Sequence, residues 1–496
     1  MIALRTWSLN CLDFRGQGVC WSFYCQLFEN PRNRGKDCLR GNLRSVANPI
    51  RANLGMTLFR QTITFILFLM LLVVVSNTRS QSSLVLPVDD DAIRYFAPPK
   101  DDPVAQLQQR LDRGEVHLEY ATPGGYLLSV LKQLQIPLSS QMLVFSKTSF
   151  QQHRIAPETP RALYFNDNAY VGWVQGGDVV ELSAVDPERG AMFYSLDQRK
   201  SAKPRFIRRE ECLQCHASPK TLGVPGHLVR SVFPNREGFP QLQAGSFLTD
   251  HSSPLKDRWG GWYVTGTHGA QRHLGNVWVQ DPEQPDHLDT EAGANLTNLW
   301  KLVQLSTYPT PDSDLVALMV LEHQTRLHNL LTRTNWETRL ALTQQVDINR
   351  AMGEPLDHWS DSTRRRIQSQ VDALLKYMLF SDETRLVEAV SGTSSFQKEF
   401  PLAGPKDRRG RSLRDFDLKQ RLFRYRCSFL IYSDAFDALP PAAKDCFFQT
   451  LWSILNGGDR CQDFASLSKT DRREILEILL ETKPGLPAYW KGATHS

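Results

Sequence analysis

The spacing of apolar residues changes once along this chain, near Glu291, and this change constrains the fold more than any other feature of the sequence. Before it, apolar residues tend to recur at every second position, which is the period of a half-buried β-strand. After it they recur at about 3.6 residues, which is the period of an amphipathic helix. The sequence therefore predicts an α+β fold, with a β-rich region at residues 142–290 followed by an α-helical region at residues 291–496.

Within the first region, β-rich runs are separated by turn signals such as Gly176-Gly177 and the segment 187–190. We expect strands within residues 142–146, 162–167, 169–174, 178–185, 191–197, 227–233, 243–250, 260–267 and 275–280. Residues 81–141 precede this region as a Pro- and Asp-rich linker with two short helices. We expect helices at 104–111, 125–134, 296–305, 315–332, 363–380, 413–423 and 471–481, with Asp314 as N-cap of the fourth.

The most apolar segment, residues 63–75, is shorter than the ~20 residues of a comfortable membrane span but has the length of a signal-peptide core. Arg60 precedes it, and Met56 stands where such a peptide would begin. Residues 56–80 are therefore predicted to be a signal peptide or an uncleaved signal anchor, with membrane attachment through residues 62–76. Residues 1–55 are a doubtful leader, either an over-extended start or a cytoplasmic segment. We expect a protein exported to the periplasm or cell envelope.

The charge of the chain does not indicate a nucleic-acid partner. The formal net charge is +5, but residues 1–55 alone account for an excess of +5, and residues 81–496 carry −2. A basic surface over the folded part of the chain is what nucleic-acid binding would need. We therefore predict no nucleic-acid partner.

Cys212-Leu213-Gln214-Cys215-His216 has the spacing Cys-x-x-Cys-His, which is the attachment signature of c-type haem. The two thiols add to the two vinyl groups of the porphyrin, and the next residue ligates the iron through its imidazole. A zinc site would need a second ligand pair, which the later cysteines do not supply by their spacing. A redox Cys-x-x-Cys would not need the histidine and would be expected in a βαβ setting. The motif therefore predicts a haem protein, and with it a redox partner protein.

Beyond this motif, the block 164–279, with the segments YFNDNAYVGWV, PRFIRREECLQCHAS and GVPGHLVRSVFP, resembles a family of large exported bacterial proteins with a single cytochrome c signature. The resemblance implies one covalent haem c per chain and electron transfer, without a defined substrate. It places the thioether bonds at Cys212 and Cys215 and the proximal iron ligand at His216.

The second axial ligand is less constrained. The next methionine after His216 is Met319, 103 positions later, and predicted strands fill part of the interval, so this is not the small all-α cytochrome c fold. Ligation by two histidines, or an open sixth position, competes with methionine ligation. His323 lies on an otherwise apolar stripe of the helix 315–332 and is the first candidate. A core histidine bonded to another partner is the alternative. The other candidates are His251, Met319, His268 and His273.

Three further groups of residues each permit two or more interpretations. Lys203, Arg205, Arg208 and Arg209 could neutralise haem propionates, dock an acidic partner or form a solvated loop. Trp173, Trp259, Trp262 and Trp278 could line the haem pocket or form ordinary core. Cys427, Cys446 and Cys461 permit one disulfide or three free thiols.

The predicted function is electron transfer by an exported haem protein. The alternatives are a haem enzyme, such as a peroxidase or a dehydrogenase haem subunit, and a haem-based sensor or structural subunit of an envelope complex.

Overall fold

A six-stranded antiparallel sheet forms the first half of the fold, and each strand pairs with the next one along the chain. In this computed structural model, which describes residues 86–99, 101–458 and 464–491, the sheet is a meander with short turns at 166–168, 174–178 and 187–189. Gly176 (φ +64°) and Gly190 (φ +88°) lie in the two tight turns that the sequence predicted. The strands are β1 (Met142–Val144), β2 (Arg161–Phe165), β3 (Ala169–Trp173), β4 (Val179–Asp186), β5 (Gly190–Asp197) and β6 (Phe206–Arg208).

The two faces of this sheet have different partners. One face packs on the short helices α2 (Pro103–Asp112) and α3 (Leu127–Gln133) in an apolar core that includes Leu182, Tyr194 and Leu196. On the opposite face, Tyr170, Ser183 and Phe193 lie side by side on β3, β4 and β5, because the register pairs each with the next. The Cys-x-x-Cys-His turn and the long helix of the second half both contact this second face.

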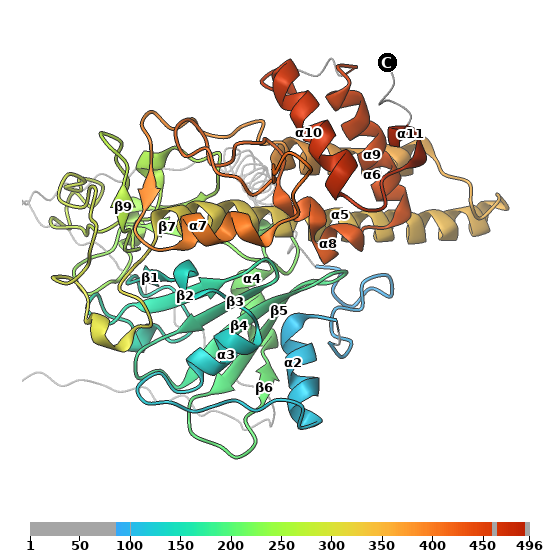
Figure 1. Cartoon of the computed structure of the whole chain (residues 1–496). Coiled ribbons are helices and arrows are strands. Elements are labelled where there is room, and N and C mark those ends of the chain that lie inside the picture. The colour runs from blue at the N-terminus through green and yellow to red at the C-terminus, as the bar shows by residue number, and fades with distance from the viewer. Residues whose placement is uncertain (1–85, 100, 459–463, 492–496) are drawn as a thin grey trace, which may run out of the picture. The chain divides into compact units, whose positions relative to one another are not determined.

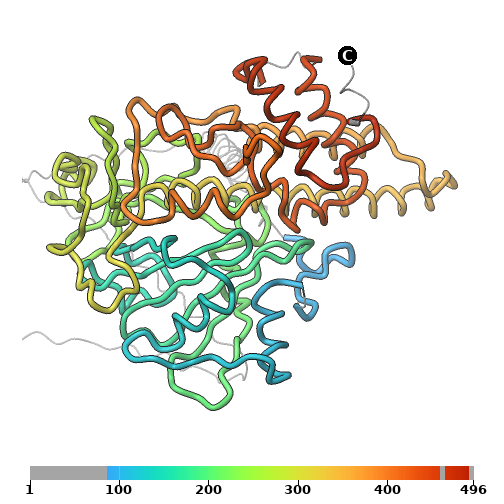
Figure 2. Tube along the Cα trace, viewed as in Figure 1, coloured from blue at the N-terminus to red at the C-terminus, as the bar shows by residue number. Residues whose placement is uncertain are grey.

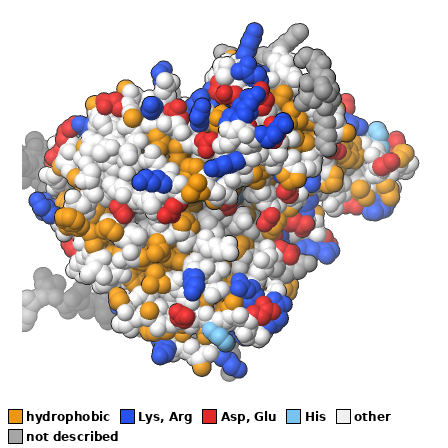
Figure 3. Space-filling view, in the orientation of Figure 1, with side chains coloured by type: hydrophobic (Ala, Val, Ile, Leu, Met, Phe, Trp, Pro, Cys, Tyr) orange, Lys and Arg blue, Asp and Glu red, His pale blue; other side chains and the backbone are white. Residues whose placement is uncertain are grey.

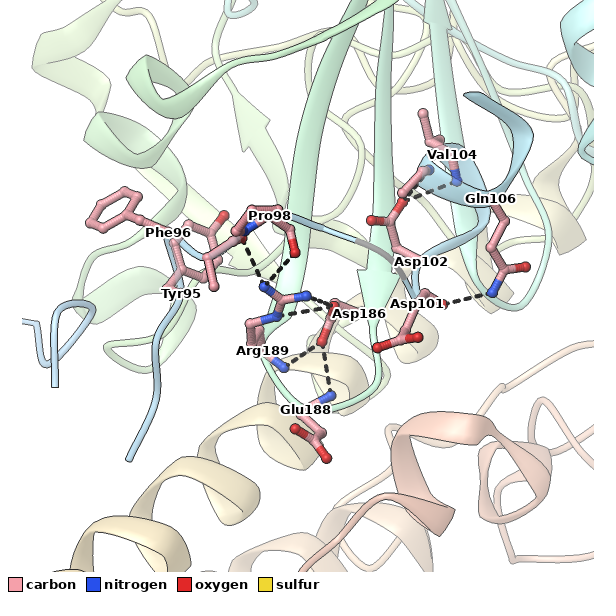
Figure 4. Close-up of polar contacts among 12 residues, drawn as sticks. Tyr95, Phe96, Pro98, Asp101, Asp102, Val104, Gln106, Asp186, Glu188 and Arg189 are labelled. Carbon is pink, nitrogen blue, oxygen red and sulfur yellow. Dashed lines mark hydrogen bonds and ion pairs between the residues drawn. The ribbon is translucent and has the colours of Figure 1, made fainter. Parts of the chain in front are cut away.

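The segment before α2 is fastened to the sheet by polar contacts (Figure 4). Arg189 pairs with Asp186 at 2.7 Å and donates to the carbonyl oxygen of Ala97 at 2.9 Å. Asp102 caps α2 by accepting from the backbone N–H of Val104, and it also accepts from the Tyr194 hydroxyl at 2.7 Å. Figure 2 shows this blue segment running beside the green strands of the sheet.

The helix α5 (Leu315–Met352) connects the two halves of the fold. Figure 1 shows it between the six-stranded sheet and the C-terminal helices. Asp314 is its N-cap, as predicted, and accepts from the backbone N–H groups of Val316 and Ala317. Every residue from Leu315 to Thr325 is buried, so α5 has no solvent face over its first three turns. Its polar side chains must therefore find partners inside the protein.

The C-terminal half is helical, as predicted. Ion pairs such as Arg409–Glu477 (2.8 Å) and Arg408–Glu481 (3.1 Å) join α10 to a neighbouring loop. In Figure 3 both signs of charge are interspersed over these helices. Within the described residues, no helix is long and apolar enough to cross a bilayer. The helices are α6 (Asp361–Met378), α7 (Phe396–Glu399), α8 (Asp434–Asp437), α9 (Pro441–Leu455), α10 (Lys469–Thr482) and α11 (Ala488–Lys491).

Two predicted helices and one predicted strand do not form. In the segment 413–423, Asp417 accepts from the backbone N–H groups of Lys419 and Gln420, and this turn replaces helical bonds. In the segment 296–305, the carbonyl of Leu296 accepts from the N–H of Gly266, which holds the chain extended. The segment 275–280 forms no strand, because Asn276 has a left-handed backbone (φ +68°).

The strands after the motif are shorter than predicted. The run 227–233 gives β7 (Val229–Val232), and 243–250 gives β8 (Ser246–Thr249), which pair as a hairpin. Of the run 260–267 only β9 (Gly266–Thr267) is a strand, and it pairs with β10 (Ser391–Gly392) from the helical half. The predicted leader and signal region, residues 1–80, lies outside the described residues.

Candidate functional site

The Cys-x-x-Cys-His motif forms a compact turn directly after the edge strand β6. A 3₁₀ turn, Glu210–Cys212, continues into a single turn of α-helix, α4 (Leu213–His216). Both cysteines are free thiols, with Cys215 exposed and Cys212 partly buried. The segment therefore presents two unpaired sulfur atoms and one imidazole within one helical turn.

His216 is oriented by the backbone that comes after it in the chain. Its Nδ1 lies 3.0 Å from the carbonyl oxygen of Gly226, and the N–H of Gly226 donates to the carbonyl of His216 at 2.8 Å. A carbonyl oxygen can only accept, so Nδ1 carries the proton and Nε2 presents a lone pair. Nε2 makes no hydrogen bond with any described residue. Burial lowers the pKa of His216, which keeps the ring neutral and able to bind a metal.

Asn329 on α5 holds this backbone in place. Its Oδ1 accepts from the N–H of His227 at 2.9 Å, and its Nδ2 donates to the carbonyl of His227 at 2.6 Å. The residue before His227 is Gly226, where a Cβ would lie 2.2 Å from the Asn329 oxygen. The close approach of α5 therefore requires glycine at this position, and the glycine carbonyl is the one that orients His216.

This arrangement predicts a specific effect of Asn329→Ala. The substitution leaves the buried N–H and C=O of His227 without partners, and we expect a loss of about 2–4 kcal/mol in the free energy of unfolding. Nitrogen NMR of histidine-labelled protein should show His216 changing from the Nδ1-protonated tautomer to a mixture. Asn335→Ala is the matched control, since Asn335 is buried on the same helix and donates to Ala438. An unchanged His216 tautomer in Asn329→Ala would contradict the orienting role.

The thiols of the motif do not resemble a redox pair. Burial, together with the nearby carboxylates of Glu211 and Glu181, raises the pKa of Cys212 to about 11. Redox Cys-x-x-Cys motifs instead lower the pKa of one cysteine. The adjacent sheet is antiparallel, so the motif also lacks the βαβ setting of thioredoxin-like proteins. Within the described residues, no three His, Cys, Asp or Glu side chains are grouped to hold a metal ion.

The basic residues before the motif mostly brace the local structure. Arg208 donates to the carbonyl of Tyr95 at 2.7 Å, and Arg209 donates to the hydroxyl of Ser195 at 2.7 Å. Arg205 forms a surface ion pair with Asp112 at 3.3 Å. Lys203 is exposed. Three of these four residues therefore have partners within the protein that the sequence did not indicate.

The candidates for a second iron ligand gather at a different place. His323 is fully buried, and its Nδ1 lies 2.8 Å from His251 Nδ1 while its Nε2 lies 2.7 Å from Ser428 Oγ. His251 and Met319 both line one pocket on this side of α5. The structure thus brings His323, His251 and Met319 together. It brings Cys212, Cys215 and His216 together separately.

The distance between the two groups is set by α5. His323 lies six residues before Asn329, which contacts the backbone beside the motif, and this corresponds to a rise of about 9 Å along the helix. His328 points to the opposite side of α5 from His323 and contacts the Tyr170 hydroxyl at 2.9 Å. Among the described residues, no contact joins His323 to His216.

His268 and His273 have local partners. His268 uses both ring nitrogens, with Nδ1 2.8 Å from the carbonyl of Gln271 and Nε2 accepting from the N–H of Asn295. His273 Nδ1 accepts from the N–H of Gly275, and its ring lies 5.2 Å from that of Trp259. Both histidines are buried in the loop region in which the sequence placed them.

The tryptophans and the remaining cysteines have their contacts in the core. Trp173 packs edge-on against Tyr308, and Trp262 donates from Nε1 to the carbonyl of Arg230. Trp259 is fully buried, and Trp278 is partly buried. Cys427 and Cys446 are free thiols, so no disulfide joins them, and Cys461 lies outside the described residues.

Sequence reasoning missed the residues that orient His216. His227 contacts Ser183 Oγ through Nε2 at 2.6 Å and lies against the Tyr170 ring, with ring centroids 4.3 Å apart and the rings tilted by 38°. The Gly- and Pro-rich segment 223–226 after the motif was a signal that the chain turns back on His216. No local pattern links His227 to Asn329, which lies 102 residues later.

Comparisons of the chain with models of protein families, with curated proteins and with solved structures find no match. The resemblance to exported single-haem proteins therefore stays a prediction. A function is therefore inferred from the Cys-x-x-Cys-His motif and its geometry.

Proposed function

We propose that this protein is an exported c-type haem protein that transfers electrons through one haem covalently bound at Cys212 and Cys215. The observation that carries the proposal is the state of His216. Its Nδ1–H is bonded to a backbone carbonyl, and its Nε2 has no hydrogen-bond partner among the described residues, directly after two unpaired thiols. Iron-ligating histidines commonly donate their other N–H in this way.

The chain supplies three groups to such a haem. Cys212 and Cys215 would form the thioether bonds, and His216 Nε2 would be the axial ligand. The haem, when bound, supplies an iron that cycles between Fe(III) and Fe(II). Gly226 fixes the orientation of the imidazole, and Asn329 fixes Gly226. Export belongs to the proposal, because haem c is attached after export, and a redox partner protein belongs to it as the source or acceptor of electrons.

Covalent attachment has a direct test. The full chain, produced with a haem c maturation system, should keep its colour in the protein precipitate after extraction with acidified acetone. Non-covalent haem would pass into the solvent, and this result would reject the proposal even if the protein bound haem.

The contacts that His323 already makes support an open sixth iron position. Both nitrogens of His323 are already bonded, so ligation would break its contacts with His251 or Ser428. His251 has one ring nitrogen engaged in that contact and lines the pocket with Met319. The same open position is what would favour the second candidate function, a haem enzyme, because a reactant could then reach the iron.

His323→Ala tests this assignment. We expect the variant to keep covalent haem and the parent's absorption spectrum and reduction potential, while it loses about 2–4 kcal/mol of stability from unpaired buried groups. The ferrous parent should bind carbon monoxide rapidly. A changed spectrum in His323→Ala, together with a parent that does not bind carbon monoxide, would instead identify His323 as the second ligand. His251→Ala is then the comparison variant.

A further inference from the structure

An open pocket lies next to the motif on the side of α5 that faces the β7–β8 hairpin. The pocket and its mouth contain about 280 Å³ of empty space. Two cationic side chains line it, Lys220 from the turn after the motif and Arg326 from α5. His227, the residue after the Gly226 that orients His216, also lines it. The pocket is therefore lined by the residue next to Gly226, whose carbonyl orients His216.

Arg326 has donors that the described residues do not use. Its side chain is about two-thirds covered, with 34% exposed, and its nearest carboxylate is Asp250 at 3.9 Å. This distance is an ion-pair contact and is too long for a hydrogen bond. The Asp250 carboxylate instead accepts from the N–H and the hydroxyl of Ser252, at 2.8 and 2.6 Å. A guanidinium with free donors in a partly covered site is suited to bind a planar carboxylate.

Lys220 is held at the rim by the turn that carries it. Ser218 caps this turn, and the Ser218 and Thr221 side chains form a reciprocal capping box. The Lys220 ammonium is exposed and forms no hydrogen bond with the described residues. Two cations therefore face the pocket against one carboxylate, Asp250, which leaves a local charge of +1.

The rest of the lining is partly apolar. Leu228, Val229 and Leu248 contribute to it, and Leu248 is 42% exposed on the edge strand β8. Thr249 adds a buried hydroxyl that makes no regular hydrogen bond, although Glu322 lies close to it. An occupant matched to this lining carries one negative charge and an aliphatic or aromatic body. A dianion would meet repulsion from Asp250 without a third cation to offset it.

We propose that Arg326 and Lys220 form a binding site for a monocarboxylate with an apolar body. Two sources of that chemistry fit. One is a propionate side chain of the haem at Cys212–His216, and this source rests on the proposed function. The other is a free aliphatic carboxylate, which needs no haem. The shared chemistry is a carboxylate held by the guanidinium and the ammonium, with its apolar part against Leu228, Val229 and Leu248.

Titration calorimetry with hexanoate at pH ~8.5 tests the site, with hexanol as the uncharged analogue and inorganic phosphate, which is a dianion at this pH, as the doubly charged one. The full chain is used in two forms, the matured protein and the Cys212→Ala/Cys215→Ala variant that cannot attach haem. We expect hexanoate, but not hexanol or phosphate, to bind the variant without haem. In that background Arg326→Gln should weaken binding by at least about tenfold, and Lys220→Gln by about threefold or more. Arg350→Gln, an exposed arginine ~36 Å further along α5, should leave it unchanged.

The matured form separates the two sources. If a haem propionate occupies the site, hexanoate binds only the form without haem. If the site serves a free carboxylate, both forms bind hexanoate equally. Hexanoate binding that Arg326→Gln leaves unchanged, or no binding to the form without haem, would overturn the proposal. If the matured protein carries no haem, the proposed function fails, while the titration of the Cys212→Ala/Cys215→Ala variant still decides the carboxylate site.

Discussion

Replacing Cys212 and Cys215 together by alanine is expected to abolish covalent haem while the protein stays folded. Cys215 is exposed and Cys212 only partly buried, so the loss of both sulfur atoms removes little core packing. We expect a change in the free energy of unfolding below about 1 kcal/mol, because surface substitutions away from packed regions have small effects. The haem absorbance of the purified protein should fall to the level of a sample made without the maturation system.

Cys446→Ala is the matched control for this double variant. Cys446 is also a partly buried free thiol, with its sulfur 3.0 Å from Gln368 Oε1, but it lies on α9 in the helical half. It should retain full haem content. A Cys212→Ala/Cys215→Ala protein that still carries covalent haem would refute the assignment of the thioether positions.

Replacing Arg258 by methionine is expected to cause a larger loss of stability than Asn329→Ala or His323→Ala. Arg258 is 3% exposed and pairs at 2.9 Å with Glu322, which is fully buried on α5. It also donates to the carbonyls of His251 and Ser253. Removing one partner of a buried ion pair costs about 3–5 kcal/mol, because Glu322 must then either stay charged without compensation or take up a proton.

The loss should depend on pH in a defined direction. Burial outweighs the attraction of Arg258 and raises the pKa of Glu322 to about 7, above the ordinary glutamate value of ~4.3. Between these values the folded protein binds a proton that the unfolded chain releases, so Glu322 makes the free energy of unfolding fall as pH rises. In Arg258→Met the pKa of Glu322 rises further, and this fall should continue above pH ~7.

Denaturant unfolding of Arg258→Met at several pH values measures this effect. The double variant Arg258→Met/Glu322→Gln should lose the additional pH dependence above ~7, because the group that titrates is gone. Arg350→Met, which breaks only the exposed pair with Asp347, should cost less than about 0.5 kcal/mol. An Arg258→Met protein as stable as the parent at high pH would show that the pair is not what holds this side of α5.

The parts of the fold that were predictable from sequence are those with local causes. The strands β3, β4 and β5 were indicated by two-residue alternation and by glycine turns, which act over a few positions. Asp314 was recognisable as an N-cap because the cap and the groups it bonds are neighbours. β6 was missed because it has three residues, one of them Arg208, and exists through its pairing with β5.

The length of α5 shows the opposite case. The predicted helix ends at residue 332, before the polar run 333–335, yet the helix continues to Met352. Trp336 and Leu340 pack in the core, and the last turns rely on buried polar residues. Gln345 and Asn349 bond to each other at 2.7 Å, and Gln345 accepts from Thr363 on α6. Hydropathy alone does not reveal a helix whose buried positions are polar.

The candidate site likewise has a part that is local in sequence and a part whose partners are distant in sequence. The motif was readable because Cys212, Cys215 and His216 lie within one turn. The partners of His323 were not, because His251 precedes it by 72 residues and Ser428 lies 105 residues after it. The apolar stripe correctly indicated that a buried His323 needs a partner, but only the tertiary structure shows which residues are its partners.

Mass spectrometry of a tryptic digest tests whether one haem is bound covalently through Cys212 and Cys215. Cleavage after Arg209 and Lys220 releases a peptide of residues 210–220 that contains the whole motif and no other cysteine. We expect this peptide, from protein made with the maturation system, to be heavier by the mass of one haem, and no other peptide to be. An unmodified peptide in the matured protein would refute haem attachment at Cys212 and Cys215.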